Sequence, residues 1–220
     1  GLLYKGKPAD TTEIKEWAAS PSYYRKRTLL RILPIAVTVI NFLCISLAIL
    51  GIISANIAGG VFVSFVLFST IFSKGITKLQ TTYGEKLQIL STYADQILLT
   101  EQKEMHSHIL QELKTDLTSQ NQTASQAVRQ LSKLMNALDQ RSNLLMSTIL
   151  NGLIFWELRQ VMRIEKWKEI HASDLPRWIE TIGEIDAYCS LATFAYNHPD
   201  YIYPTIAAQS FHLQAEALGH

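Results

Sequence analysis

The sequence predicts a mainly α-helical protein of long antiparallel helices, with one apolar helical hairpin and a strand at its C-terminal end. The 220 residues include 10 Gly and 6 Pro, and these cluster at a few breaks. Between the breaks, segments rich in Leu, Ala, Gln, Glu and Lys favour helix. Residues 32–73 carry no charge, which predicts the hairpin. Alternating apolar and polar residues over 211–218 predict the strand.

Charge and cysteine content exclude some classes of protein. The formal net charge is +1, so the chain has no overall basic field with which to hold nucleic acid. Cys44 and Cys189 lie far apart in the sequence and form no CxxC motif, so neither a disulfide framework nor a thiol metal site is indicated. This cysteine usage fits a reducing compartment.

The N-terminal segment, residues 1–31, is expected to hold a short helix. Asp10 can cap that helix, which carries Ile14 and Trp17 on one face and ends before Pro21. The basic and aromatic stretch YYRKR follows and leads into the apolar region.

The charge-free region, residues 32–73, reads as two apolar arms. A break at Ser54–Asn56 and Gly59–Gly60 supplies turn chemistry between them. Each arm has about the length needed to cross a hydrocarbon core of about 30 Å. Basic residues flank both arms at their outer ends: Arg25, Lys26, Arg27 and Arg31 before the first, Lys74 and Lys78 after the second.

Two interpretations of this hairpin stay open. A transmembrane hairpin fits arms that are apolar all round, and the basic flanks place both of its ends in the cytoplasm. The alternative is a hairpin buried in a soluble core or covered by a partner protein, with polar residues such as Asn41 and Ser64 inside. We expect the transmembrane hairpin.

Residues 74–205 are predicted to form long helices that fold back on one another. Leu79, Tyr83, Leu87, Leu90, Tyr93 and Ile97 recur at three- and four-residue steps, as on one face of a long helix. The stretch MHSHILQELKTDL continues or restarts that helix. Another helix carries Ala124 to Leu138, and a long one runs from Asn143 to about His171. A final helix, capped at Ser173–Asp174, runs to about Tyr196.

Residues with the chemistry of active or metal sites do not form a recognisable constellation. His106 and His108 would point about 200° apart on a helix, so they cannot chelate one metal from one face. Glu184 and Asp186 are also two residues apart, so on a helix they would point in different directions and could not act together as an acid/base pair. Cys189 is expected to be a buried structural thiol. Trp156, Trp167 and Trp178 are expected to be packing residues. No catalytic, cofactor-binding or metal-binding residue is therefore predicted.

The last part of the chain resembles the MutS family of DNA mismatch-repair proteins. The residues that carry the resemblance belong to a helix that returns to the core in that family and to the Tyr-x-x-Pro after it. They are Ile185, Asp186, Ser190, Leu191, Ala192, Ala195, Tyr196, Tyr201 and Pro204. The final ALGH is similar to the first half of the motif that opens the family's ATPase domain, with His220 its histidine. The resemblance covers residues 141–220, and 143–168 is similar to a membrane-associated MutS-like subgroup.

The resemblance implies a core and lever region ending where an ATPase domain, residues 206–220 onward, begins. In that family, long helices couple ATP-driven movement to a distant DNA-binding end. It implies DNA and a second copy as partners of the full-length protein, with ATP and Mg in the ATPase domain and no cofactor in this segment. The family's mismatch-reading Phe-x-Glu motif belongs to another domain, and we expect it to be absent here.

Two functions follow as expectations. The first is the core/lever domain of a MutS-like ATPase at the inner membrane, with its soluble part in the cytoplasm. The second is a membrane-anchored helical adaptor that does not bind DNA. A wholly cytoplasmic location stays open if the hairpin is covered by protein. This segment itself, without a phosphate-binding loop, is not expected to be an enzyme.

Overall fold

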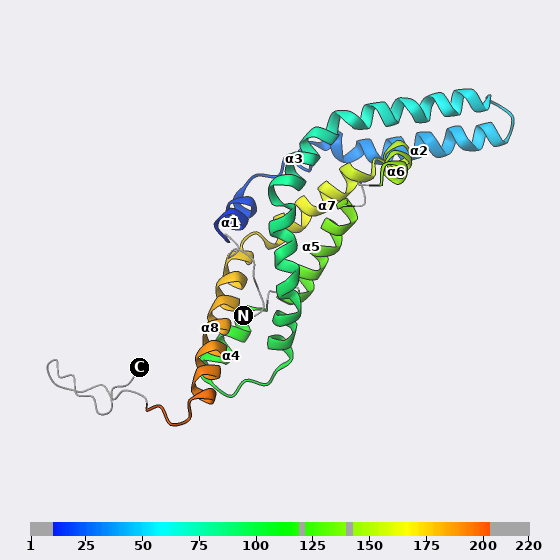
Figure 1. The fold of residues 1–220 in the computed structure, drawn as a ribbon. Coiled ribbons are helices and arrows are strands. Elements are labelled where there is room, and N and C mark those ends of the chain that lie inside the picture. The colour runs from blue at the N-terminus through cyan, green and yellow to red at the C-terminus, as the bar shows by residue number, and fades with distance from the viewer. Residues whose placement is uncertain (1–10, 119–121, 140–142, 203–220) are drawn as a thin grey trace. The chain divides into compact units, whose positions relative to one another are not determined.

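The computed structural model describes residues 11–118, 122–139 and 143–202 (Figure 1). These residues are mainly helical, and their one piece of β structure is an isolated antiparallel bridge between Thr118 and Thr123. The mainly-α fold class is thus confirmed. Asp10, the strand expected over 211–218 and His220 lie outside the described residues.

The chain divides into two compact units, Gly1–Gly183 and Glu184–His220. The first unit contains every helix from α1 to α7 and the beginning of α8. The second unit contains the rest of α8 and the residues after it. The helix α8 spans Leu175–Asn197 and begins directly after the predicted cap at Ser173–Asp174.

The N-terminal part of the first unit consists of a short helix and the first arm of the hairpin. Helix α1, Thr11–Ala19, buries Ile14 and Trp17, as predicted. Helix α2, Thr28–Ile49, contains Pro34 and ends two residues before Gly51, which has φ 73°. That left-handed conformation suits glycine, because it has no Cβ to clash with the backbone.

Helix α3 is continuous from Ala55 to Gln102, a length of 48 residues. It begins as the second arm of the hairpin and then leaves the hairpin to run along the helical body, changing direction on the way (Figure 1). The expected break at Ser54–Asn56 and Gly59–Gly60 is right only at Ser54. Ala55, Asn56 and both glycines lie inside α3, and the chain reverses over Leu50–Ser54. A break at residues 103–107 separates α3 from α4, so the helix restarts rather than continues.

The helical body is formed where α5 packs between α3 and α7. Helix α4 spans His108–Asp116 and α5 spans Ala124–Asp139. The α5 residues Leu131, Met135 and Leu138 are buried, as their spacing predicts. They share the core with α7 residues, and the Trp167 indole Nε1 donates a hydrogen bond to the Ala127 carbonyl at 2.8 Å.

The long helix predicted from Asn143 to His171 is two helices. Helix α6, Leu144–Ile154, ends at Phe155, and α7, Trp156–His171, begins there. Phe155 has φ 51°, the left-handed region that non-glycine residues seldom adopt. The prediction failed because every residue from Asn143 to Trp156 is compatible with helix, and the break depends on tertiary contacts described below.

Candidate membrane-contacting site

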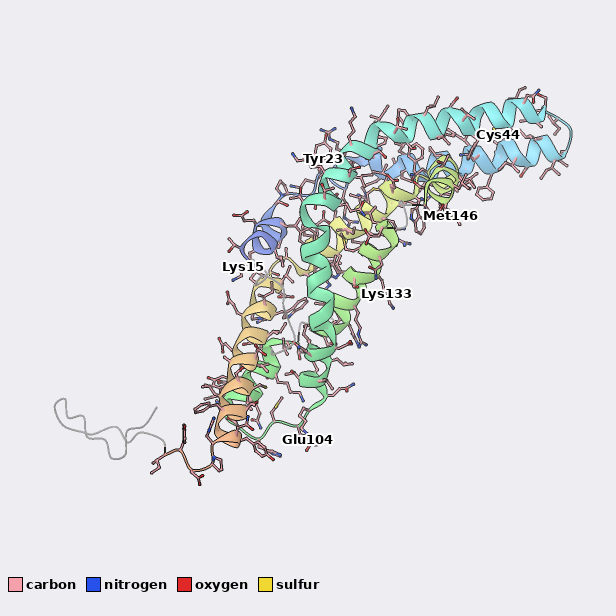
Figure 2. The ribbon with its side chains drawn as sticks, in the orientation of Figure 1. Lys15, Tyr23, Cys44, Glu104, Lys133 and Met146 are labelled. Carbon is pink, nitrogen blue, oxygen red and sulfur yellow. The ribbon has the colours of Figure 1, made fainter. Side chains whose placement is uncertain are left out.

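The hairpin exposes apolar side chains over most of its length. In the described part of the chain, α2 and residues 55–82 of α3 are long and apolar enough to cross a membrane. Only 17% of the apolar window in α2, and none of that in α3, is buried. Val39 is 60% exposed and Leu67 is 65% exposed. Side chains stand outward along both arms in Figure 2.

This exposure distinguishes the two interpretations of the hairpin. A core helix of a soluble protein buries its apolar side chains within the fold, whereas these arms do not. Contiguous apolar surface of this extent is rare on soluble monomers and marks contact with lipid or with another protein. The hairpin is therefore a candidate membrane-contacting site, and the alternative of burial in a core formed by the described residues is wrong.

The short helix α6 packs against both arms of the hairpin. The Asn41 side-chain amide donates to the Gly152 carbonyl at 2.9 Å and to the Leu153 carbonyl at 3.3 Å. A Cβ on Gly152 would lie 2.4 Å from a Phe62 ring carbon and 2.6 Å from a Val66 methyl. Only glycine therefore lets α6 approach this closely, and the buried amide of Asn41 satisfies two carbonyls at its end.

The break between α6 and α7 is held by a buried carboxylate. Glu157 accepts hydrogen bonds from Asn151 at 2.9 Å, Ser147 at 3.1 Å and Ser73 at 3.2 Å. In return the Asn151 side-chain oxygen accepts from the Glu157 backbone N–H at 3.0 Å, which caps the start of α7. Phe155 fills the turn and packs on Phe65, Phe68 and Phe72 of α3. The hydrogen bonds of Glu157 and Asn151 and the aromatic packing of Phe155 together stabilise the left-handed backbone conformation of Phe155.

Arg159 joins the end of α6 to the proline of α2. Its Nε donates to the Ile154 carbonyl at 2.8 Å. Its Nη2 donates to the Pro34 carbonyl at 2.9 Å and to Thr38 Oγ1 at 2.7 Å. One rigid guanidinium therefore fixes α2, α6 and α7 to one another at the side of the hairpin nearest the body.

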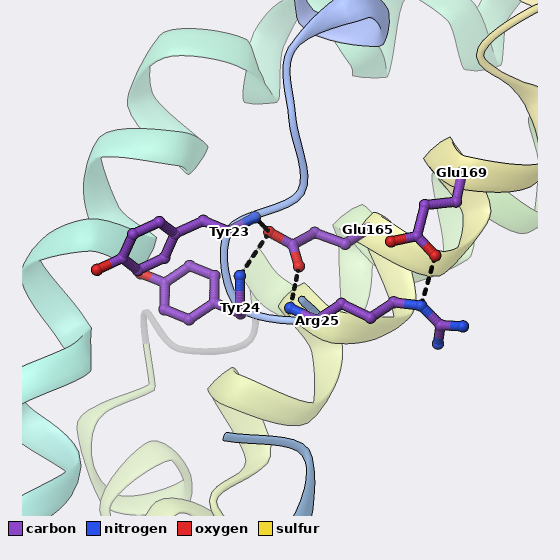
Figure 3. Close-up of polar contacts among 5 residues, drawn as sticks. All are labelled: Tyr23, Tyr24, Arg25, Glu165 and Glu169. Atoms are coloured by element: carbon purple, nitrogen blue, oxygen red, sulfur yellow. Dashed lines mark hydrogen bonds and ion pairs between the residues drawn. The ribbon is translucent and has the colours of Figure 1, made fainter. Parts of the chain in front are cut away.

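The segment that enters the hairpin is held by a second carboxylate, Glu165 of α7 (Figure 3). Glu165 accepts three consecutive backbone N–H groups, from Tyr23 at 2.7 Å, Tyr24 at 3.1 Å and Arg25 at 2.6 Å. We call this arrangement the Glu165 clasp. Charge-assisted bonds of this kind are about twice as strong as neutral ones, so the clasp fixes the point from which α2 begins.

Neighbouring charges complete the clasp. Lys168 Nζ donates to the Ser20 carbonyl at 2.8 Å, and burial lowers the pKa of this ammonium although Glu165 and Glu169 favour its charge. Burial alone raises the pKa of the Glu169 carboxyl, but hydrogen bonds from Arg25 and Ser22 outweigh it and lower the pKa. Burial, reinforced by Glu165, raises the pKa of the Tyr24 hydroxyl.

Cations surround the base of the hairpin. Lys26, Arg27 and Arg31 precede or begin α2 and are exposed, and Lys74 and Lys78 are exposed on α3. The Arg27 guanidinium lies 4.6 Å from the centre of the Tyr23 ring. Such a rim suits the anionic headgroups of a membrane surface.

The residues considered for catalysis or metal binding are not brought together. In the described ranges there is no group of three or more His, Cys, Asp or Glu side chains that could hold a metal. His108 lies 3.5 Å from Glu112 on the same exposed helix. Trp167 and Trp178 are buried, as expected. Cys189 was expected to be buried and is exposed, because it lies on the part of α8 in the second unit.

The expectation that the sequence contains no Phe-x-Glu is wrong. Phe155-Trp156-Glu157 has that spacing. Both Phe155 and Glu157 are buried, however, and they hold the α6–α7 break. Neither side chain is available to stack on or bond to a base, so the match is one of spacing alone.

Comparison with models of protein families, with curated proteins and with solved structures finds no match to this chain.

Sequence reasoning missed α6, the Asn41 contact and both structural carboxylates. One signal for α6 was present: residues 142–156 carry no charge, between Arg141 and Glu157. No sequence signal indicated the role of Glu165, because its partners are backbone groups about 140 residues earlier in the chain.

Proposed function

We propose that this chain is the membrane-anchored core and lever region of a MutS-like, DNA-associated ATPase, and that it couples movement at a nucleotide-binding domain to the bilayer. The single observation that carries the proposal is α3. It is one uninterrupted helix that forms an arm of the apolar hairpin and then packs in the helical body. At about 1.5 Å per residue, its length measured along the helix axis is roughly 70 Å.

A continuous helix is suited to transmit displacement, since its ends are packed on different surroundings. The hairpin end of α3 contacts α2 and α6, whereas its other end contacts α5. Glu101, near the end of α3, accepts a hydrogen bond from the Ser125 backbone N–H at 3.0 Å, which ties this end to the beginning of α5. Movement of the body would therefore displace the hairpin unless α3 bent.

The residues that resemble the MutS family support the other half of the proposal. Leu191 and Tyr196 of α8 and the following Tyr201 are exposed in the described part of the second unit. Exposed apolar and aromatic side chains are suited to pack against a further domain. In the proposal that domain binds ATP and Mg, and it pairs two copies of the protein. This region then supplies no catalytic group.

The alternative is a membrane-anchored helical adaptor that does not bind DNA. The exposed hairpin supports it equally, because insertion into a bilayer requires neither DNA nor ATP. The two functions differ in what the full-length protein does with DNA. Salt-sensitive binding to duplex DNA, falling steeply as salt is raised, is expected of the first and not of the adaptor.

The first test of the proposal is carbonate extraction of membranes from cells that express the full-length protein. We expect the protein in the membrane pellet and a version lacking residues 32–73 in the supernatant. A less disruptive variant replaces Val39 and Leu67, one exposed residue on each arm, with Arg. Each Arg near the middle of a bilayer costs about 2.5–3.5 kcal/mol on insertion scales, so this variant is expected to be extracted.

Leu99→Arg is the matched control, since Leu99 is as exposed as Leu67 but lies on α3 outside the hairpin. It is expected to stay in the pellet. Extraction of the unaltered protein would overturn the membrane part of the proposal and favour a protein partner that covers the hairpin. Membrane retention without DNA binding at low salt would leave the adaptor as the function.

A further inference from the structure

The exposed face of α6 is the feature that the proposed function leaves unexplained. Leu145 is 79% exposed and Ile149, one turn later, is 48% exposed. Met146 lies beside them on the same short helix and is also exposed. Side chains separated by three or four residues share a helix face, so these three form one apolar surface.

The helix α6 lies against the hairpin at positions within the charge-free arms. Its contacts reach Asn41 on α2 and Phe62 and Val66 on α3. Counted along the arms from Arg27 and Lys74, these positions are roughly 12–21 Å from those basic residues, within the depth of a hydrocarbon core. Figure 1 views α6 nearly end-on where the hairpin runs across the picture, so α6 crosses the arms.

The length of α6 excludes a third transmembrane helix. It has 11 residues, about half of what a crossing requires. Several backbone groups at its two ends nevertheless have hydrogen-bond partners inside the protein. Asn41 and Arg159 satisfy the carbonyls of residues 152, 153 and 154 at its C-terminal end. The Asn143 side chain accepts from the Met146 N–H at its start. A lipid-exposed helix end requires such internal partners.

We propose that α6 is a third membrane-embedded element, a short re-entrant helix whose Leu145, Met146 and Ile149 face contacts lipid hydrocarbon. Its surface is continuous with that of the hairpin on which it is docked. Residues 143–156 carry no charge and Glu157 follows them, so in this proposal the chain leaves the bilayer at Glu157. This inference rests on the proposed insertion of the hairpin.

The test uses spin labels on the full-length protein in phospholipid vesicles. All native cysteines of the full-length protein, Cys44 and Cys189 among them, are first replaced with Ala. A single nitroxide is then attached at Ile149→Cys or, in a second variant, at the more exposed Leu145→Cys. Matched labels at Leu67→Cys, on the hairpin, and at Lys133→Cys, exposed on α5, report lipid and water. Collision with oxygen, which enters lipid, is compared with collision with a water-soluble nickel complex.

Labels at 145 and 149 are expected to resemble the label at 67, with oxygen collisions favoured and nickel collisions suppressed severalfold relative to position 133. A water-like ratio at 145 and 149, with a lipid-like ratio at 67, would overturn the inference and leave the proposed anchor intact. Shielding from both reagents would also overturn it, because it would mean that protein covers α6. A water-like ratio at 67 would overturn both the inference and the anchor.

Discussion

The clasp depends on one side chain, Glu165, that accepts three backbone N–H groups. Glu165→Gln keeps the shape but removes the charge and one acceptor oxygen, so at least one of the three N–H groups loses its partner. We expect the free energy of unfolding to fall by about 1–3 kcal/mol. Thermal unfolding in detergent, followed by circular dichroism, measures it.

Glu169→Gln is the matched control for the clasp. Glu169 is on the same helix and pairs with Arg25 at 2.6 Å, but both side chains are partly exposed. Exposed ion pairs contribute about 1 kcal/mol or less, so this variant is expected to unfold near the wild-type temperature. Equal losses in the two variants would show that the three backbone bonds are not what holds the segment.

Acid is expected to destabilise the protein in part through His171. This ring is buried between Trp167 and Trp178, and its Nε2 lies 2.9 Å from the Gln122 side-chain nitrogen, which donates to it. Burial lowers the pKa of His171 below 6.5, and Asp174 offsets this only in part. The unfolded chain therefore binds the proton first, and stability falls as the pH drops below about 6.5.

The measurement is the unfolding temperature between pH 7.5 and pH 5.5. The wild-type protein is expected to lose more over this interval than His171→Gln, which has no ring to protonate. His108→Gln, at an exposed position, should keep the wild-type slope. If the unfolding temperature changes equally with pH in all three proteins, protonation of His171 does not contribute to the loss of stability in acid.

At the scale of elements, the docking of α6 on the hairpin depends on the absence of a side chain at Gly152. Gly152→Ala places a Cβ against Phe62 and Val66 at less than van der Waals distance. We expect a loss of about 1–3 kcal/mol, the usual cost of overpacking. Gly59→Ala is the control, because nothing lies within 4 Å of its Cβ, and it should stabilise α3 by up to about 1 kcal/mol. Thermal unfolding in detergent distinguishes the expected loss of stability in Gly152→Ala from the expected gain in Gly59→Ala. A stabilised Gly152→Ala variant would contradict the close approach of α6 to α3.

Elements with a strong pattern were predictable from sequence, and those that depend on distant contacts were not. The apolar arms follow from charge-free composition, and α5 follows from its periodic Val128, Leu131 and Met135. The division at Phe155 has no local signal, because a left-handed Phe is disfavoured on its own and is supported by α3 aromatics more than 80 residues earlier. The turn predicted at Gly59–Gly60 was wrong because glycine permits a turn without requiring one.

The candidate site was predictable only in outline. The arms and their basic flanks are visible in the sequence, and so is the alternative of a covered hairpin. What decides against burial in this chain's own core is the exposure of the arms, which depends on where the body lies. Asn41 illustrates the limit, since the same buried Asn would fit a soluble core, and only its bonds to Gly152 and Leu153 reveal its role.

At the scale of the whole molecule, the basic base and the uncharged tip of the hairpin determine how it enters a membrane. Transfer of Arg and Lys across the bilayer is unfavourable, so in the proposed anchor we expect the basic ends to stay in the cytoplasm and the tip to cross. Helix α2, with 22 residues, is about 33 Å long and matches a core of about 30 Å. Ser54 at the tip should therefore lie on the opposite side of the bilayer from Lys133 in the body.

A membrane-impermeant maleimide tests this orientation in sealed vesicles from cells that express the full-length protein with all its native cysteines, Cys44 and Cys189 among them, replaced by Ala. Ser54→Cys should react only from the face that is external in the cell, and Lys133→Cys only from the cytoplasmic face. Reaction of both from the cytoplasmic face would mean that the hairpin dips into one leaflet and returns. The lever would then end within the bilayer, and movement carried along α3 could reach lipid but not the far side.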